Sequence, residues 1–512
     1  MTSPTLELLQ GSRVRRWAAV GVLTASLLVL MMDMTILNIA VPDMAASLRP
    51  TSDQLLWIVD IYSLVLAGLL VSWAAIADRW GRKRMLMLGY VIFGATSVLV
   101  LWASTPESVI AIRALLGVGG AMIMPTTLSL IRVIFVDPRE RASALGIWAA
   151  VSSLGAAVGP LVGGILLEHF SWHAAFLVNV PLMLAAFVAG LWLLPESRVA
   201  NPGTWDWIGA ALSFLGMILL VWAIKTFGKA SSFLVLEGWI ALLLAAALLA
   251  WFGARCLRRS SPLLEIRLFR SRTFSAGIIA ALGSMFALGA ALLLLAQWMQ
   301  LVDGASPVEA GLRLFPAAIA GASASLAAPP VARWLGARAV ISGGVAAAGL
   351  GLLAIGVQPG ELSMVTVFIA LVLIGAGSGS LAIGSAMIMY ETPEDKAGSA
   401  AALEETSYEL GSVLGVAVLG SIAALLYRSE FAGGHLLAEI DPVLAESAAE
   451  SLGSAVAIGE ELGAAGLASE AGIAFTHSMQ VTGIIGGTIM LGIAFTVFLL
   501  TPRGTDVSAV RH

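Results

Sequence analysis

The sequence predicts an all-α membrane protein with fourteen transmembrane helices. Of its 512 residues, 59% are hydrophobic and only 12% are charged, and the mean hydropathy is +0.94. The surface of a water-soluble protein needs about twice that share of charge. The second observation is a series of stretches of roughly twenty apolar residues, each long enough for a hydrocarbon core about 30 Å thick. The third is a set of carboxylates inside those stretches, because charge within a membrane is costly and usually serves a function.

The apolar stretches follow one another along the chain with short polar connections. Gly, Ala and Ser are frequent within them, which suits close packing of helices. In chain order the stretches are 17–41, 55–77, 85–104, 109–131, 142–167, 172–194, 205–223, 233–253, 274–302, 310–331, 339–358, 362–390, 398–427 and 478–500.

The first stretch is predicted to stay attached to the chain as a membrane helix. Arg13, Arg15 and Arg16 precede it and resemble the charged start of a signal peptide. The stretch is too long for such a peptide, and no small-residue cleavage site follows a short apolar core.

Lys and Arg are distributed very unevenly between the two sides of the predicted membrane. If the N-terminus is cytoplasmic, that side receives 22 of them, whereas the other side receives only Arg49, Lys225, Lys229 and Arg428. The positive-inside rule then places both termini in the cytoplasm. We expect the inner membrane of a bacterium, although the sequence also allows a eukaryotic membrane.

The basic, polar segment 254–275 divides the chain into two parts. A degenerate repeat supports two halves, because Ile-Ala-Asp-Arg-Trp-Gly-Arg-Lys-Arg at 76–84 resembles Val-Ala-Arg-Trp-Leu-Gly-Ala-Arg at 331–338. Repeated halves around a site at the membrane midplane are a common transporter plan. The predicted regions are an N-terminal six-helix half at 1–197, an inserted helix pair at 198–253, a cytoplasmic linker at 254–275 and a C-terminal six-helix half at 276–512.

The outer connection at 428–477 is unusually acidic. After Arg428 it contains no further Lys or Arg, and its Ala, Gly, Leu and Ser background is compatible with short amphipathic helices. Its acidic residues are Glu430, Glu439, Asp441, Glu446, Glu450, Glu460, Glu461 and Glu470. It is either a solvated surface hairpin or an acidic cap that influences the release or access of cations.

Two local patterns point to helix packing and to a conformational latch. In stretch 142–167 the glycines and the proline allow intimate helix contact and a bend. After the second stretch, Asp78 can cap or pair with a neighbouring helix end and Arg82 can bind the partner half, which would hold one conformation. The residues of the two patterns are Gly155, Gly159, Pro160, Gly163 and Gly164, and Asp78, Arg79, Gly81 and Arg82.

With these motifs the chain resembles the major facilitator superfamily, in particular its fourteen-helix drug/proton antiporters. The glycine spacing matches the helix-five antiporter motif of that branch, and 78–84 matches the superfamily's loop motif. Residues 33–42, 57–67, 112–120 and 171–181 resemble further signatures of pumps of the Qac and Smv type. The resemblance implies export of quaternary ammonium compounds and other lipophilic cations.

The residues themselves also favour a cation carrier. One desolvated carboxylate can hold either a proton or a cationic drug, so competition between them gives exchange. A binding site for a lipophilic cation also needs aromatic side chains, whose faces attract quaternary ammonium groups. The candidates for proton coupling are Asp33, Asp60, Glu404, Glu405 and Arg113, and those for substrate binding are Asp60, Trp57, Tyr62, Trp148, Glu404, Glu405 and Tyr408.

These candidates form two acidic stations at different depths. At about 1.5 Å per residue, Asp33 and Asp60 lie in the outer half of the membrane, whereas Glu404 and Glu405 begin about 10 Å from the cytoplasmic end of their helix. Glu405 shares a helix face with Glu409, and Glu404 shares another with Tyr408. Arg113 needs an internal acceptor because its guanidinium does not deprotonate; Asp33 or backbone carbonyls of the first helix are candidates.

The energy source is expected to be an ion gradient. The sequence has no phosphate-binding Gly-rich Lys-Ser/Thr loop, so ATP is not the driver. His residues are scattered, and a single cysteine, Cys256, argues against a thiol-ligated metal site, so no metal and no cofactor are expected. The expected partners are protons, lipophilic cationic drugs and the lipid bilayer, without nucleic acid, and we expect a monomer.

Two other functions compete with this interpretation. The first is an exporter of an endogenous amphiphile, such as a lipid or siderophore, with incidental drug export; anionic substrates would need positive cavity residues, and only Arg113 and Arg313 lie inside helices. The second is a membrane receptor or enzyme, which would need a soluble sensor domain or a nucleophile constellation.

Overall fold

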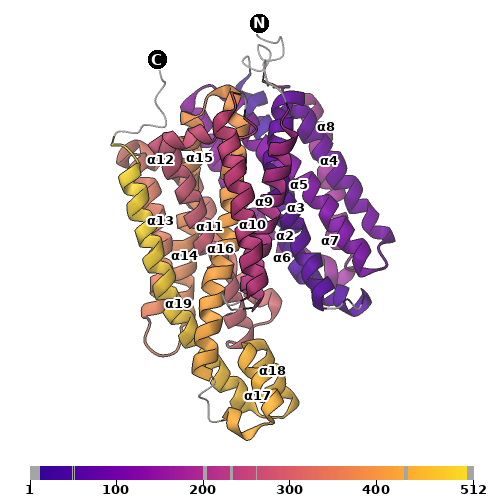
Figure 1. The fold of residues 1–512 in the computed structure, drawn as a ribbon, viewed down its shortest axis with the longest axis vertical. Helices are drawn as coiled ribbons and strands as arrows, with labels where there is room; N and C mark the ends of the chain where they lie inside the picture. Colours follow the sequence, from indigo (N-terminus) through magenta and orange to yellow (C-terminus); the bar gives the residue numbers. More distant parts are fainter. Residues whose placement is uncertain are drawn as a thin grey trace.

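The structure, a computed structural model, describes residues 12–48, 50, 52–199, 205–230, 235–260, 262–431 and 436–503. Over these residues the chain forms helices and contains no strand. Long helices run side by side, and α2 begins at the same end of the bundle at which α19 ends (Figure 1). Both ends of the described chain therefore lie at one end of the bundle, as an arrangement with both termini on one side of a membrane requires.

The first part of the chain forms a bundle around long helices. Its helices are α2 (Arg13–Leu48), α3 (Ser52–Trp80), α4 (Arg82–Leu99), α5 (Pro106–Ile134), α6 (Pro138–His169), α7 (Ala174–Leu177) and α8 (Asn179–Leu193). Within this bundle α2 packs against α6, α3 against α5, and α4 against α5 and α8.

The remainder of the chain forms a helix pair and a second bundle. These helices are α9 (Trp207–Ala230), α10 (Leu236–Arg258), α11 (Arg272–Leu301), α12 (Pro307–Leu335), α13 (Ala337–Val357), α14 (Met364–Gly379), α15 (Leu381–Glu391), α16 (Ala397–Phe431), α17 (Pro442–Glu450), α18 (Leu452–Glu461) and α19 (Ala465–Leu500). Helix α9 packs against α10 and also against α3 and α16. The inserted pair thus contacts both bundles; the exact region boundaries stay a prediction.

Each of the fourteen predicted stretches contains helix, but fewer than fourteen helices of the described chain meet the length and hydropathy that a membrane span needs. Thirteen helices of the described chain are long and apolar enough to cross a membrane. The predicted stretch 142–167 is not among the thirteen, although α6 is a continuous helix of 32 residues there.

Two predicted stretches are broken where we expected one continuous helix. Stretch 362–390 changes from α14 to α15 at Ser380, whose hydroxyl donates to the carbonyl of Gly377. The break follows a Gly-Ser-Gly-Ser sequence, and these residues favour helix ends over helix interiors. Stretch 172–194 is likewise split, at Val178 between α7 and α8.

The acidic outer connection forms the short helices α17 and α18, as its composition allowed. They project beyond the bundle at the end opposite the chain termini (Figure 1). Ser451 begins α18 and its side chain accepts a hydrogen bond from the backbone N–H of Ser454. The hydroxyl of Tyr427, at the outer end of α16, donates to the carbonyl of Ala448 over 3.2 Å and ties α17 to the bundle.

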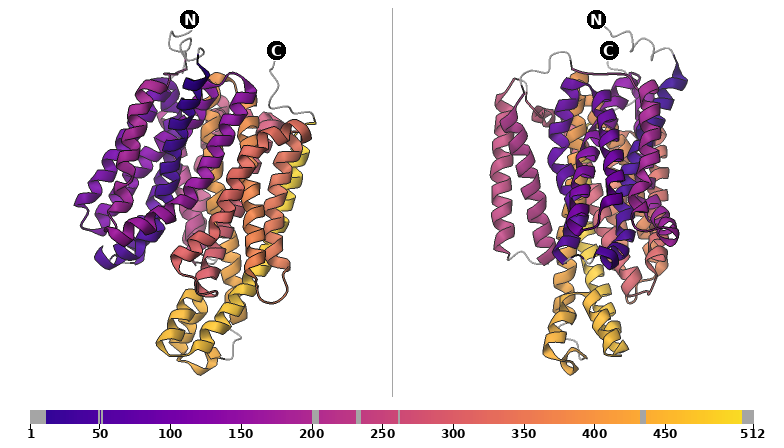
Figure 2. Two further views of the ribbon diagram at one scale, coloured as in Figure 1. Left: turned by 180° about the vertical axis from the view of Figure 1, so that it is seen from behind. Right: turned by 90° about the vertical axis from the view of Figure 1, so that its right-hand side faces the viewer.

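The two bundles meet at the end that carries the termini. There Arg132 of α5 donates to the carbonyl of Thr392 over 3.2 Å. Helix α6 packs along α12 over most of its length, because a Cβ at Gly146 would lie 2.9 Å from the carbonyl oxygen of Ser325 and a Cβ at Gly164 would lie 3.9 Å from Val308. Lys396, just before α16, lies 3.5 Å from Glu265 of the segment that joins the halves. At the opposite end the ribbons of the two bundles diverge (Figure 2, left).

Candidate functional site: two buried acidic stations

Asp33 and Arg113 form a buried ion pair at the first station. One Arg113 terminal nitrogen lies 2.9 Å from Asp33 Oδ2, and the two side chains are 2% and 1% exposed. Helices α2 and α5, which pack together, bring them into contact. Asp33 was one of the two kinds of acceptor that we predicted for Arg113, and this prediction is confirmed. The backbone acceptor that Arg113 also uses is Ile58 of α3, at 3.2 Å from Nε, and not a carbonyl of α2.

Asn179 and Tyr62 complete this station. The Asn179 amide donates to Asp33 Oδ1 over 2.6 Å, so both carboxylate oxygens of Asp33 are occupied. The Arg113 guanidinium lies 4.5 Å from the ring centroid of Tyr62, within the range of cation–π attraction. Asp33 is therefore held by fixed protein donors on both sides.

Glu404 lies at the second station, where the two bundles meet. Its carboxylate accepts hydrogen bonds from Ser385 of α15 and from Tyr408, the latter over 2.7 Å. The Tyr408 ring stacks on Trp148 of α6 with centroids 6.4 Å apart, and Trp148 donates to Thr127 of α5 over 3.2 Å. A chain of polar and aromatic contacts thus runs from α16 in the second bundle to α5 and α6 in the first.

Glu405 is the unusual residue of this station. It is fully buried, and neither of its carboxylate oxygens finds a hydrogen-bond donor in the described part of the chain. An ionised carboxylate in such a place is very unfavourable without a partner. Glu405 is consequently stable only as a neutral acid or beside a cation.

Glu409 lies one turn beyond Glu405 on the same helix face. The two carboxyl groups interact electrostatically, as their spacing predicts. Lys225 of α9 also interacts electrostatically with Glu409. The inserted helix pair therefore contributes a positive charge to the acidic face of α16.

The predicted aromatic pair Trp57 and Tyr62 does not converge on one point. Tyr62 lies against Arg113, whereas Trp57 contacts Trp222 of α9 with ring centroids 5.2 Å apart. The residues are five apart, which places them about 140° apart around a helix. Asp60 belongs to α3, but its side chain lies outside the described residues.

The glycines of α6 allow this helix to pack closely against α2. A Cβ at Gly155 would lie 2.8 Å from Cβ of Met31, and a Cβ at Gly159 would lie 2.8 Å from the carbonyl oxygen of Met32. Both neighbours belong to α2, the helix that carries Asp33. Gly163 is buried and Gly164 half-buried, whereas the side chain of Pro160 lies outside the described residues.

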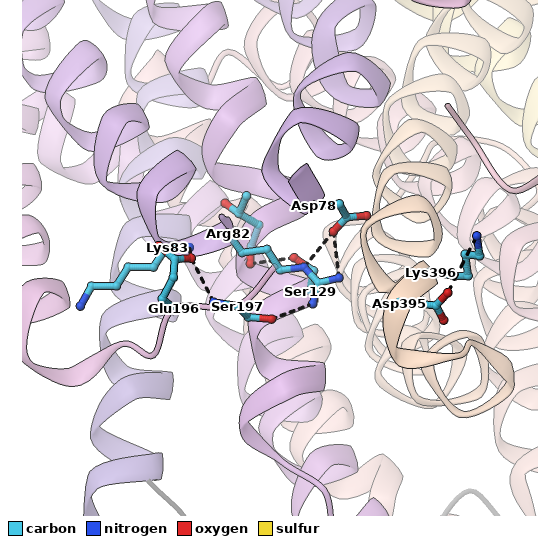
Figure 3. Close-up of polar contacts among 9 residues, drawn as sticks. Asp78, Arg82, Lys83, Ser129, Glu196, Ser197, Asp395 and Lys396 are labelled. Atoms are coloured by element: carbon cyan, nitrogen blue, oxygen red, sulfur yellow. Dashed lines mark hydrogen bonds and ion pairs between the residues drawn. The ribbon is translucent and has the colours of Figure 1, made fainter. Parts of the chain in front are cut away.

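Residues of the latch motif lie close to one another, and the Arg82 side chain points toward Asp78 and Ser197 (Figure 3). Arg82 donates to Asp78 over 2.9 Å and to the Ser197 hydroxyl over 3.4 Å. The Asp78 carboxylate lies directly against Gly398 of α16, where any Cβ would overlap it. These contacts bring Asp78 to the partner bundle, and the predicted binding of Arg82 to that bundle stays a prediction.

The other two motif residues have local roles. Gly81 joins α3 to α4 with a φ of 127°, and a Cβ there would lie 2.5 Å from the Glu196 carboxylate. Its lack of a side chain therefore meets both a conformational and a steric demand. The Arg79 guanidinium lies 5.3 Å from the ring of Trp205, just before α9.

The sequence did not predict three residues that interact with the buried carboxylates: Asn179, Ser385 and Lys225. Asn179 lies at the start of an apolar helix, where an amide needs a partner, and this was a usable signal. Ser385 is an ordinary small residue of α15, and no pattern distinguishes it. Lys225 lies near the outer end of α9, where snorkelling to the membrane surface was the simpler expectation.

The chain is similar to known transport proteins over most of its length. Residues 23–416 match the family model described as Major Facilitator Superfamily. The chain is 39% identical over 487 residues to the multidrug efflux pump LfrA of Mycolicibacterium smegmatis, covering 94% of this chain and 96% of that protein. It is 37% identical over 453 residues to the methyl viologen resistance protein SmvA of Salmonella typhimurium, covering 88% and 90%.

A solved structure shares the fold at low sequence identity. The human organic anion transporter MFSD10 (TETRAN) superposes with a TM-score of 0.64 at 12% identity, covering 94% of this chain and 99% of that one. At this identity the likeness concerns the arrangement of helices alone.

Proposed function

Since the chain belongs to the Major Facilitator Superfamily and is thereby a transporter and not an enzyme, we propose that it exports lipophilic cations in exchange for protons. That it exports drugs follows from its efflux-pump relatives. The proton coupling and the cationic substrates are our proposal. Methyl viologen, named in one relative's title, carries two quaternary nitrogens, which supports a cationic substrate class.

The observation that carries the proposal is the unpartnered carboxylate of Glu405. A buried acid without donors can be neutralised by a proton or by a cation, but not by both at once. Its neighbour Glu404 accepts a hydrogen bond from Tyr408, whose ring stacks on Trp148 of the first bundle. A change of charge at this station can therefore alter the contacts between the two bundles. Asp33 and Asp60 are the proton-coupling candidates at the outer station.

The arrangement of the bundles supports alternating access. Contacts at Asp78 and Arg132 join the halves at the end with the termini, and the ribbons diverge at the other end (Figure 2). With cytoplasmic termini this conformation faces outward. In the proposed cycle, protonation of the carboxylates releases the cation to the outside, and deprotonation on the cytoplasmic side prepares the site again.

The membrane voltage constrains the number of protons. Moving one positive charge outward costs about 2.3 kcal/mol per 100 mV, and one proton returning inward only cancels this cost. One-for-one exchange would run on the pH gradient alone. More than one buried carboxylate per transport cycle, as Glu404 and Glu405 offer, would allow the voltage to drive export as well.

Purified protein in detergent tests the exchange directly. Addition of ethidium or benzalkonium should release protons from the wild-type protein into a weakly buffered solution. Asp60→Asn and Glu405→Gln should each abolish this release, because each removes a carboxylate at which cation and proton compete. Glu361→Gln is the matched control, since Glu361 is an exposed carboxylate outside the helices.

Drug sensitivity of living cells provides a second test of the proposed export. Expression in a pump-deficient bacterium should lower its sensitivity to both compounds, and a protonophore should restore that sensitivity. Wild-type proton release from the two variants would refute the residue assignment. Unchanged sensitivity of the cells would refute cation export and favour an endogenous amphiphile as substrate.

A further inference from the structure

A cavity lies where the hairpin formed by α17 and α18 joins the bundle. Its volume is about 210 Å³, and it is enclosed by α11, α16, the start of α18 and α19. Leu294 of α11, Ala423 and Tyr427 of α16, Leu452 of α18 and Phe475 of α19 are among its walls. We call it the hairpin cavity.

The position of the hairpin cavity separates it from the proposed exchange site. Along α16, Tyr427 lies eighteen positions beyond Glu409, which corresponds to about 27 Å at 1.5 Å per residue, whereas Val416, another lining residue, lies seven positions beyond it, about 10 Å. A group bound beside Tyr427 therefore does not contact Glu409. The cavity belongs to the outer end of the bundle, where α17 and α18 project (Figure 1).

The walls of the hairpin cavity suit an apolar group. A cavity of about 150 Å³ lined by apolar side chains stays dry and binds benzene. At about 210 Å³ the hairpin cavity accommodates one aromatic ring or a short alkyl chain, but not a whole polycyclic dye. Gln297 and Ser451, both exposed, mark the wall through which a ligand can keep its polar end in water.

Aromatic rings and charge at the rim favour a positive polar end. Tyr427 and Phe475 lie with ring centroids 6.4 Å apart, and aromatic faces attract quaternary ammonium groups. Near them, Glu430 lies 2.6 Å from His477 at the base of the hairpin. Arg428 is the only Lys or Arg residue of segment 428–477, against eight acidic residues, so the field there attracts cations.

We propose that the hairpin cavity binds the apolar arm of a lipophilic cation on the outer side of the protein. The proposal rests on the proposed function for the class of ligand. The cation's arm, a single ring or an alkyl chain, enters between α11 and α16, and its charged head stays at the acidic rim. The hairpin thereby acts as an exit station that holds a released cation away from the glutamates.

A chain-length series tests this site. Binding of alkyltrimethylammonium ions with four to ten carbons is measured by calorimetry on the whole protein in nanodiscs. Each methylene that enters an apolar cavity should tighten binding roughly threefold to fourfold. Gly420→Leu should remove this gain for the longer chains and weaken decyltrimethylammonium binding at least about tenfold, the value of two excluded methylenes.

Gly492→Leu is the matched control variant. A Cβ at Gly420 would lie 3.7 Å from Leu293, a wall of the cavity, so a leucine there enters the cavity, whereas a Cβ at Gly492 meets nothing within 4 Å. Both substitutions replace a helical glycine by the same side chain. Gly492→Leu should therefore leave the chain-length dependence unchanged.

The outcomes separate the site from the transport function. Equal chain-length dependence in wild type and Gly420→Leu would overturn the proposal. Equal weakening for decanoate and decyltrimethylammonium would also overturn it, because the cavity would then take any apolar chain, including a lipid acyl chain. If the wild type binds long-chain cations in this way but releases no protons on adding them, the site stands and the proposed antiport fails.

Discussion

Breaking the Asp33–Arg113 pair should destabilise the protein more than removing it. Asp33→Asn leaves the Arg113 charge buried with only the Ile58 carbonyl and the Tyr62 ring as partners. Arg113→Gln leaves the Asp33 carboxylate with only Asn179. Removing one partner of a buried ion pair typically costs about 3–5 kcal/mol, because the remaining charge is uncompensated.

The double variant should recover most of that loss. Asp33→Asn combined with Arg113→Gln replaces the two charges by two neutral amides, and neutral replacement of a buried pair often changes the stability little. We expect each single variant to lose about 3–5 kcal/mol and the double variant to lose about 2 kcal/mol or less. The coupling free energy of the cycle should then exceed about 3 kcal/mol.

Reversible unfolding in mixed micelles, followed by tryptophan fluorescence, measures these free energies. The same cycle at Asp303 and Arg313 is the control, since these paired side chains are 32% and 34% exposed and should couple by about 1 kcal/mol or less. If the double variant loses as much as the two single variants together, the pair is not an energetic unit and the reasoning from its burial is wrong.

Two further substitutions test the packing of α6 and the charge on α9. Gly159→Ala should cost about 1–3 kcal/mol of unfolding free energy, because its Cβ would lie 2.8 Å from the Met32 carbonyl, whereas Gly21→Ala, with nothing within 4 Å, should cost nothing; the same unfolding assay measures both. Lys225→Met should lower the half-maximal cation concentration for proton release by about threefold to tenfold, because a competing positive charge near Glu409 is removed; an unchanged value would show that Lys225 only anchors α9.

Most of the architecture could be predicted from the sequence, because few backbone structures are stable inside a membrane. Every backbone group in lipid must be satisfied within the element, so apolar stretches of this length become helices. The sequence did not predict where helices are interrupted within the apolar stretches or how far they extend beyond them. The break at Ser380 follows a local Gly-Ser-Gly-Ser sequence that the hydropathy of the stretch does not show. Helices α2 and α19 extend well past the apolar limits at Val41 and Ser478 because polar residues also continue a helix outside lipid.

The candidate site was only partly predictable, for a related reason. Helical spacing on one chain segment correctly paired Glu404 with Tyr408. Contacts between helices far apart in sequence are not encoded in such spacing. The bond from Asn179 to Asp33 spans 146 residues, and the contact of Trp57 with Trp222 depends on the place of α9 beside α3, which no local pattern reveals.

The two acidic stations differ in how their charge is balanced, and this difference assigns them different tasks. Asp33 has a fixed counter-charge in Arg113 and a fixed donor in Asn179, so a cation that approached it would have to displace a guanidinium that cannot deprotonate. Glu405 has no such occupant among the described residues. We therefore propose that direct exchange of proton for cation takes place at Glu405. Asp33 is better suited to hold α2, α5 and α8 in one arrangement, and protonation of Asp33 would act by releasing Arg113 and so changing how these helices pack.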